Sequence, residues 1–227
     1  MGEIAGMIID IIQTAGIFKQ TYEVCGKGFG FSVNVGRFHR YQNILMTNPC
    51  DRIEGEWQFS RWYHYIPFRW LFGKANVKNR FRIRQNESPV GTVQYSHHGF
   101  LKSRYEMLLD DGTVVYGYAY SWGKFDYLSI YAGDEQIALL ETYMVSENDC
   151  FRHKLYLMET HENLAQLLSF FSVYYVAGKF VTRNNGYFGT GVQYAWSFSR
   201  YRRMYDPAWR ERNFPNDDFW GKINRFD

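Results

Sequence analysis

The sequence predicts a mainly β protein, in which an antiparallel closed barrel of meandering hairpins surrounds a buried hydrophobic helix. An N-terminal helix and a C-terminal tail are added, and the chain of 227 residues forms a single domain. Two observations favour this fold. Short segments that alternate apolar and polar residues follow one another about 10 residues apart, joined by polar turns, as in an antiparallel meander. A later segment, residues 160–178, is apolar on nearly every side, so as a helix it must be surrounded by protein.

The first 21 residues are interpreted as an amphipathic helix that covers roughly Ile4 to Phe18. At helical spacing, one side of this segment would carry Ile4, Ile8, Ile11 and Ile12. The segment lacks a basic region and contains Glu3 and Asp10, so we do not expect a signal peptide.

The barrel strands are expected between residues 22 and 159. The segment Tyr22–Val35 alternates as a strand, whereas Gly36–Gly55 is irregular. Seven further strands are predicted at Asn79–Gln85, Val90–Tyr95, Ser103–Leu109, Thr113–Trp122, Phe125–Tyr131, Gln136–Val145 and Phe151–Met158. Closure of the meander into a barrel would remove exposed sheet edges.

The central helix is expected to begin at Thr160, whose hydroxyl can cap the first turn, and to end at Gly178. It is shorter than the roughly 20 apolar residues of a membrane span. The extension 184–227 contains Asp206-Pro207, a pair that favours a short helix over Ala208 to Asn213. The tail should pack on the barrel through Trp209, Phe214, Phe219 and Trp220.

Composition narrows the classes of function. Aromatic residues make up 20% of the chain, which favours strands, and a net charge of +3 does not by itself imply a polyanionic partner. The three cysteines, Cys25, Cys50 and Cys150, are far apart and form no C-x-x-C motif, so we expect neither a zinc site nor disulfides. We therefore expect the cysteine thiols to be reduced, as in a cytoplasmic protein. We expect no metal and no cofactor.

Two hairpins and the helix that follows them carry a resemblance to a known family. The hairpins read LLDDGTVVYGYAYSW and DEQIALLETYMVSENDCFRHKLYLME, and the helix contains NLAQLLSFFSVYYV. The run from Asn79 to Phe180 resembles the tubby C-terminal-like superfamily, which includes the LURP-one-related proteins and phospholipid scramblases. The resemblance implies an antiparallel barrel that encloses a hydrophobic C-terminal helix. Tubby-type proteins bind phosphoinositide headgroups through basic residues, so it also implies an anionic lipid ligand.

Two groups of basic residues are candidate ligand-binding sites. Arg80, Arg82 and Arg84 share one strand face with Lys78 beside them, and could hold the phosphates of an anionic lipid or nucleic acid. The commoner arrangement for such a strand is a solvent face whose arginines are paired with carboxylates. The second group surrounds Tyr201 and consists of Arg200, Arg202 and Arg203, for which the alternative is a tail docked on an acidic surface.

An aromatic insertion at residues 57–73 is a candidate contact with a membrane or a partner. The candidate contact residues in it are Trp57, Trp62, Phe68, Trp70 and Phe72. The alternative is a lid over the barrel mouth or over the N-terminal helix.

The segment Lys27–Phe31 resembles the first half of the RNP1 signature of RNA-binding domains. The match ends there, because Ser32 and Asn34 stand where the signature requires an aliphatic and an aromatic residue. RNA binding through this strand is therefore only a remote alternative, and we expect no nucleic acid partner.

The sequence thus favours a non-catalytic binding or regulatory protein that engages anionic lipid headgroups or a protein partner. No G-x-S-x-G motif and no Cys–His pairing is visible, although catalytic groups can also assemble from distant segments. The alternative is a small-ligand carrier or an enzyme with a pocket at the barrel mouth. A deep pocket lined by convergent polar groups would favour that alternative.

Overall fold

The computed structural model describes most of the chain. The described residues are 6–15, 20–38, 41–57, 81–98, 102–147, 150–179, 191–192, 195–197, 199–215 and 217. The aromatic insertion beyond Trp57 lies outside them.

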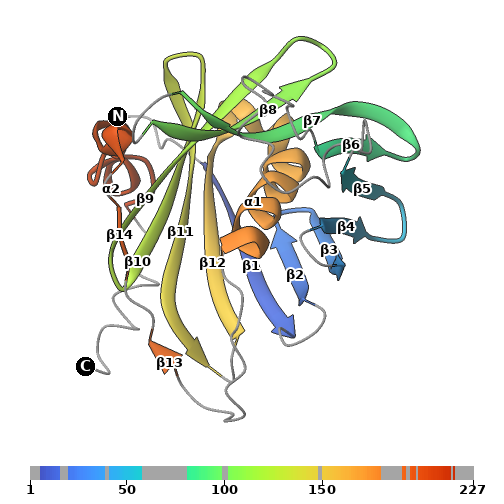
Figure 1. Ribbon diagram of the computed structural model, residues 1–227, viewed down its shortest axis with the longest axis horizontal. Coiled ribbons are helices and arrows are strands. Elements are labelled where there is room, and N and C mark those ends of the chain that lie inside the picture. The colour runs from blue at the N-terminus through green and yellow to red at the C-terminus, as the bar shows by residue number, and fades with distance from the viewer. Residues whose placement is uncertain are drawn as a thin grey trace, which may run out of the picture.

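Twelve antiparallel strands form a closed barrel (Figure 1). Each strand pairs with its neighbours in the chain, and the ring closes where β1 pairs with β12. The strands are β1 (Gly6–Ala15), β2 (Gln20–Gly26), β3 (Phe29–Phe38), β4 (Tyr41–Thr47), β5 (Arg52–Trp57), β6 (Phe81–Gln85), β7 (Ser88–His97), β8 (Ser103–Leu109), β9 (Val114–Gly123), β10 (Phe125–Ala132), β11 (Glu135–Glu147) and β12 (Cys150–Met158). The predicted closed meander is therefore confirmed.

The N-terminal segment corrects one prediction, because Gly6–Ala15 is strand β1 and not a helix. Its residues alternate between buried and more exposed positions, with Ile9 and Ile11 fully buried and Ile12 36% exposed. The isoleucines fit a helical spacing and a strand spacing about equally well. The segment is a strand because it pairs with β12, from Gly6 opposite Met158 to Ile12 opposite Arg152.

Two further predictions between residues 20 and 57 were wrong. The segment Tyr22–Val35 is not one strand but a hairpin, in which β2 and β3 are joined by a tight turn. Gly28 occupies this turn with a φ of +86°, a conformation that favours glycine. The segment expected to be irregular contains β4 and β5, which form the next hairpin around Asn48-Pro49.

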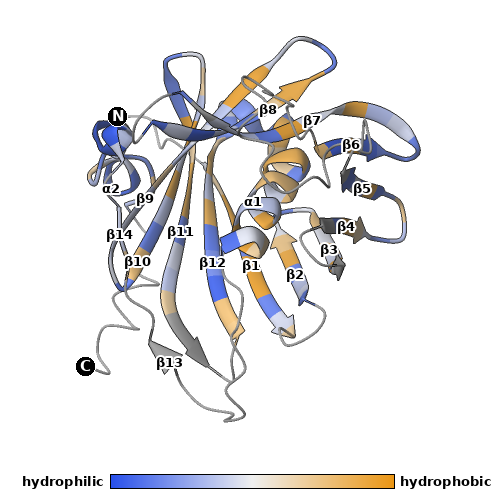
Figure 2. Cartoon of the chain, viewed as in Figure 1, coloured by the Kyte–Doolittle hydropathy of each residue, from blue (hydrophilic) through white to orange (hydrophobic). Residues whose placement is uncertain are grey.

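The central helix lies inside the barrel, as predicted (Figure 1). It consists of a 3₁₀ turn, η3 (Glu159–Leu164), followed by α1 (Ala165–Lys179). Apolar residues of the helix and of the surrounding strands together form one core (orange in Figure 2). Every residue of α1 from Leu168 to Ala177 is buried, so the helix has no solvent-exposed face there. This agrees with the sequence, in which the apolar residues do not form a single stripe.

Both predicted helix caps differ from the structure. Met158 precedes the first turn without a side-chain cap, and the Thr160 hydroxyl is hydrogen-bonded to Nδ1 of His161 instead. Gly178 lies within the last turn, because α1 continues to Lys179. No helix in the described part of the chain is long and apolar enough to cross a membrane.

The C-terminal tail packs on the outside of the barrel. Two short strands, β13 (Gly191–Val192) and β14 (Ala195–Trp196), pair with β11 and β9. The 3₁₀ turn η4 (Arg200–Met204) and the helix α2 (Trp209–Asn213) follow, and α2 confirms the predicted short helix. The outer cluster that holds the tail consists of Leu139, Tyr156, Trp209 and Phe214.

Candidate functional site

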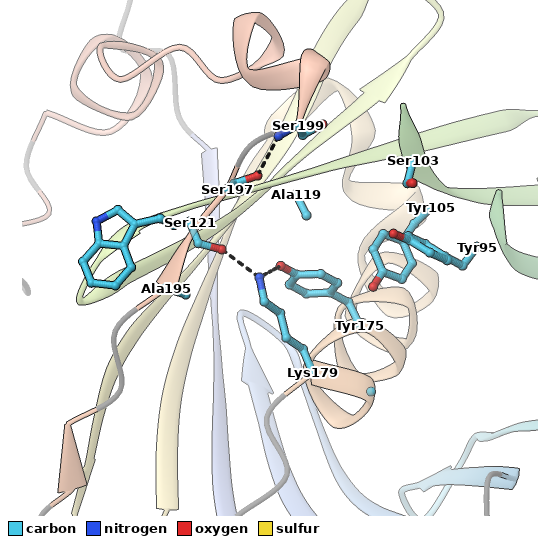
Figure 3. A pocket seen from close by; sticks show the side chains of 12 residues that line it. Tyr95, Ser103, Tyr105, Ala119, Ser121, Tyr175, Lys179, Ala195, Ser197 and Ser199 are labelled. Carbon is cyan, nitrogen blue, oxygen red and sulfur yellow. Dashed lines mark hydrogen bonds between the residues drawn. The ribbon is translucent and has the colours of Figure 1, made fainter. Parts of the chain in front are cut away.

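A pocket of about 640 Å³ opens at the end of α1, where β8 and β9 stop being paired (Figure 3). Pairing between β8 and β9 runs from Tyr105 opposite Gly117 to Leu108 opposite Val114. Farther along β9, β14 takes the place of β8. The pocket lies between these two paired stretches, and its walls include Tyr95, Ser103, Tyr105, Ala119, Ser121, Ala195, Trp196, Ser197 and Ser199.

The floor of the pocket is a polar cluster in which Lys179, the partly exposed last residue of α1, meets buried residues. The Lys179 ammonium is ion-paired with Asp126 of β10 and donates hydrogen bonds to Ser121 Oγ at 2.9 Å and to the Tyr175 hydroxyl at 3.0 Å. Asp126 is fully buried and accepts hydrogen bonds of 2.6 Å from both Ser121 and Tyr175. One carboxylate and one ammonium therefore neutralise each other beneath the pocket.

Aromatic rings form the wall opposite β9. The ring centroids of Tyr95 and Tyr105 are 4.8 Å apart, and Tyr105 meets Tyr175 edge-on at 5.0 Å. The Tyr95 side chain is 47% exposed, so its ring is accessible at the rim.

Tyr105 and Tyr175 stay protonated at neutral pH. Burial raises the pKa of Tyr175 well above its ordinary value, and the charge of Asp126 raises it further. Burial likewise raises the pKa of Tyr105, with smaller contributions from Tyr95, Tyr174 and Asp126. Because a general base must be deprotonated near neutral pH, these phenols are suited to hydrogen bonding and not to proton abstraction.

The outer face of the same strand ends carries exposed tryptophans. Trp122 of β9 and Trp196 of β14 are directly opposite each other and are 55% and 56% exposed. The Arg202 guanidinium lies 5.4 Å from the ring centre of Trp122, and Arg200 and Arg203 are also exposed. We call these five residues the mouth patch.

The segment that carries these arginines is held by aromatic contacts. In η4, Tyr201 packs on Tyr118 with ring centroids 4.9 Å apart, and Tyr205 packs on Tyr127 at 4.4 Å. The alternative of a tail docked on an acidic surface therefore does not describe η4. It does describe α2, where Arg210 forms a 3.1 Å ion pair with Glu141.

The predicted arginine stripe is only partly described. Arg82 and Arg84 lie on β6, opposite Glu56 and Glu54 of β5. Arg84 is ion-paired with both carboxylates, at 3.3 Å from Glu56 and 3.9 Å from Glu54. Carboxylate pairing therefore accounts for Arg84, while Lys78 and Arg80 lie outside the described residues.

The other candidates are placed as follows. Trp57 is the last residue of β5, and Trp62, Phe68, Trp70 and Phe72 lie outside the described residues. Phe31 of the RNP1-like segment points into the barrel and is 4% exposed, so its ring is not available to stack on a base.

Within the described part of the chain, no group of three or more His, Cys, Asp or Glu residues could hold a metal ion. No disulfide joins the three cysteines, all of which lie in the described part of the chain.

Sequence reasoning gave a pocket at the barrel mouth only as an alternative, and it named neither the residues of the pocket floor nor the tryptophan pair. One pattern could have indicated the floor: Asp126 has the same strand parity as the core residues Leu128 and Ile130, which places a charged residue on an apolar face. Tyr175 and Lys179 also stand four residues apart on a helix, a spacing that brings two side chains together. The pairing of Trp122 with Trp196 had no such local pattern.

The fold and site together define a closed twelve-stranded antiparallel barrel that encloses a helix and has a polar pocket at one mouth. Comparison of the chain with models of protein families, with curated proteins and with solved structures finds no match.

Proposed function

We propose that this protein is a non-catalytic binding protein that docks on anionic lipid headgroups through the mouth patch. The observation that carries the proposal is the cross-strand pair of Trp122 and Trp196, each more than half exposed, with the Arg202 guanidinium over the Trp122 ring. Arg200 and Arg203 are exposed in the same 3₁₀ turn as Arg202.

Each component of the mouth patch has a physical role at a bilayer surface. Tryptophan is favoured at the membrane–water interface, where its ring lies among the headgroups and its N–H remains hydrogen-bonded. Each arginine near an anionic leaflet contributes about 1 kcal/mol of attraction. Arg200 and Arg203 stand three residues apart in a 3₁₀ turn, so their side chains emerge on the same side.

The mouth patch is a better candidate than the arginine stripe on β6. Arg84 already has two carboxylate partners, so a phosphate there would compete with Glu54 and Glu56. Arg202, in contrast, lies over aromatic rings, at 5.6 Å from Tyr120 and 5.4 Å from Trp122. A cation over an aromatic face keeps its full charge for an external anion.

The resemblance to the tubby C-terminal-like superfamily supports the same proposal. A barrel that encloses a hydrophobic helix is the architecture that the resemblance implies, and we propose that the chain is a member. Tubby-type members bind phosphoinositide headgroups through basic residues, which agrees with a basic and aromatic docking surface.

Liposome flotation tests the proposal. The protein should float with vesicles of phosphatidylcholine and phosphatidylserine, remain unbound with phosphatidylcholine alone, and dissociate at high salt because screening weakens exposed charge contacts. The double variant Arg200→Gln/Arg203→Gln and the variant Trp122→Ala should each reduce binding. Arg82→Gln/Arg84→Gln, which removes the same charge elsewhere, is the matched control.

Two outcomes would contradict the proposal. Absence of flotation with anionic vesicles would leave a protein partner as the ligand of the mouth patch. Loss of flotation in the β6 control, with retention in the mouth-patch variants, would move the site to the arginine stripe.

A further inference from the structure

We propose that the pocket at the barrel mouth binds an uncharged carbohydrate of the size of a mono- or disaccharide. Its site is distinct from the mouth patch except at Trp196, which belongs to both. The pocket lies on the inner side of β9, where Ala119 and Ser121 line it, whereas Tyr120 and Trp122 lie on the outer side with η4.

The charges of the site favour an uncharged ligand. Lys179 is the charged member among the described residues that line the pocket, and its ammonium is held by Asp126, Ser121 and Tyr175. An ammonium has three N–H donors, and these three partners use them. A carboxylate or phosphate ligand would have to draw Lys179 away from Asp126, which would leave a fully buried carboxylate without its counter-charge.

The polar groups of the walls match ligand hydroxyls. Ser103, Ser197 and Ser199 contribute hydroxyl groups, and Tyr95 and Tyr105 contribute phenols. The hydroxyls of Ser121 and Tyr175 are used within the floor cluster. A hydroxyl both donates and accepts, so a wall of hydroxyls suits a ligand that also carries many groups able to do both. Sugars have this property, whereas an alkyl chain would bury the same hydroxyls without partners.

The arrangement of these hydroxyls is fixed by the local backbone. Ser199 Oγ accepts a hydrogen bond of 3.1 Å from the Tyr201 amide and so caps η4, while Ser197 Oγ accepts one of 3.4 Å from the Ser199 amide. Each accepting hydroxyl keeps its own proton to donate into the pocket. The serines are therefore oriented before a ligand arrives, which lowers the entropy lost on binding.

The aromatic wall completes the match. Tyr95 and Tyr105 present ring surfaces beside the serines, and the C–H faces of a pyranose ring pack on such surfaces while its hydroxyls point to the sides. The volume of about 640 Å³ lies within the range of roughly 300–1,000 Å³ that is usual for small-molecule sites.

Saturation-transfer difference NMR on the full chain tests this inference. The probes are neutral sugars, namely glucose, galactose, maltose and lactose, with glucuronate and glucosamine as charged counterparts of the same size. We expect saturation transfer to at least one neutral sugar at up to about 10 mM, a concentration that detects a dissociation constant of about 1 mM. Glucuronate and glucosamine should bind more weakly than the corresponding neutral sugar.

Variants at the rim connect the binding to this pocket. Tyr95→Ala removes an exposed ring and should weaken binding about tenfold, whereas Tyr95→Phe keeps the ring and should retain most of the affinity. Leu108→Ala, at a leucine of β8 that is 43% exposed and does not line the pocket, is the control for folding and non-specific transfer.

Three results would overturn the inference. They are absence of transfer to every neutral sugar, tighter binding of a charged counterpart, and neutral-sugar binding that Tyr95→Ala leaves unchanged. Because Trp122→Ala alters the mouth patch without touching the pocket, sugar binding should survive in that variant even if membrane docking is lost.

Discussion

Tyr175 of the enclosed helix donates a 2.6 Å hydrogen bond to Asp126 of β10, a carboxylate that is fully buried. The same carboxylate is ion-paired with Lys179, one turn farther along α1. The end of the helix is thus attached to the barrel wall through Asp126 of β10 and, by way of Lys179, through Ser121 of β9. This attachment also forms the floor of the pocket.

The Asp126–Lys179 pair should respond asymmetrically to the loss of either partner. Lys179→Met leaves a fully buried carboxylate without its counter-charge and should lower the free energy of unfolding by about 3 kcal/mol. Asp126→Asn should cost less, because the Lys179 side chain is 29% exposed and can turn toward water. Urea denaturation of both variants measures the difference. Equal losses, or a larger loss for Asp126→Asn, would contradict this account of the cluster.

Because α1 is buried, a charged residue introduced on it should prevent the protein from folding. Leu168 is fully buried in the core, and Leu168→Asp should abolish soluble expression because the new carboxylate has no partner there. Leu168→Ala should still fold but lose about 2–5 kcal/mol of stability. Leu108→Asp, the same change at an exposed leucine, should stay within about 0.5 kcal/mol of the wild type. Soluble, cooperative folding of Leu168→Asp would contradict the enclosure of the helix.

A glycine in the wall allows the helix to approach closely. A Cβ added at Gly55 of β5 would lie 2.1 Å from the Phe81 ring and 2.6 Å from the Phe170 ring. Gly55→Ala should therefore destabilise the protein by about 1–3 kcal/mol through overpacking. Gly30→Ala is the matched control, since its nearest new contact would be the Val24 carbonyl oxygen at 3.8 Å. Similar thermal unfolding of the two variants would show that the contact is relieved at little cost.

Glu106 on the outer face of β8 should make stability depend on pH. Burial opposes its ionisation, but hydrogen bonds from Arg104, Gln94, His98 and Ser96 outweigh this and lower its pKa to about 2, from an ordinary value of 4.5. A lowered folded-state pKa stabilises the protein above about pH 5, and this stabilisation is lost as the pH falls toward 2.

The measurement compares the wild type with Glu106→Gln in urea from pH 7 to pH 2. At pH 7 the variant should be less stable by about 2–3 kcal/mol, and the two curves should converge at low pH. Ser96→Ala, which removes one hydrogen bond and keeps the charge, should move the point of convergence to higher pH. A constant difference across the range would show that the charge of Glu106 is not the cause.

Prediction from sequence succeeded where the pattern was strong and local. From Ser103 onward the strands alternate clearly and are bounded by turns such as Asp110-Asp111-Gly112, so β8 was predicted with the bounds Ser103–Leu109 that it has. The helix near residue 170 was identified because it is apolar on every side. Prediction failed where two patterns overlapped, as in Gly6–Ala15, whose isoleucines satisfy a helix as well as a strand.

The candidate site was much less predictable than the fold. Of the predicted basic residues, Arg202 lies over the Trp122 ring and Arg200 and Arg203 are exposed in the same turn, but Trp122 and Trp196 themselves were not singled out. Their pairing depends on β14 reaching the end of β9, 74 positions earlier in the chain, and no local preference specifies that contact.

By itself the sequence determined that this chain forms an antiparallel meander with a helix that needs cover on all sides, because strand alternation and helix apolarity are properties of neighbouring residues. Only the tertiary structure decided that the N-terminal segment would be the strand that closes the barrel, and that Ser121, Asp126, Tyr175 and Lys179 would meet at its mouth. Lys179 is separated from Asp126 by 53 positions and from Ser121 by 58. Closure of the barrel brings such distant residues together, and no pattern of adjacent residues contains that information.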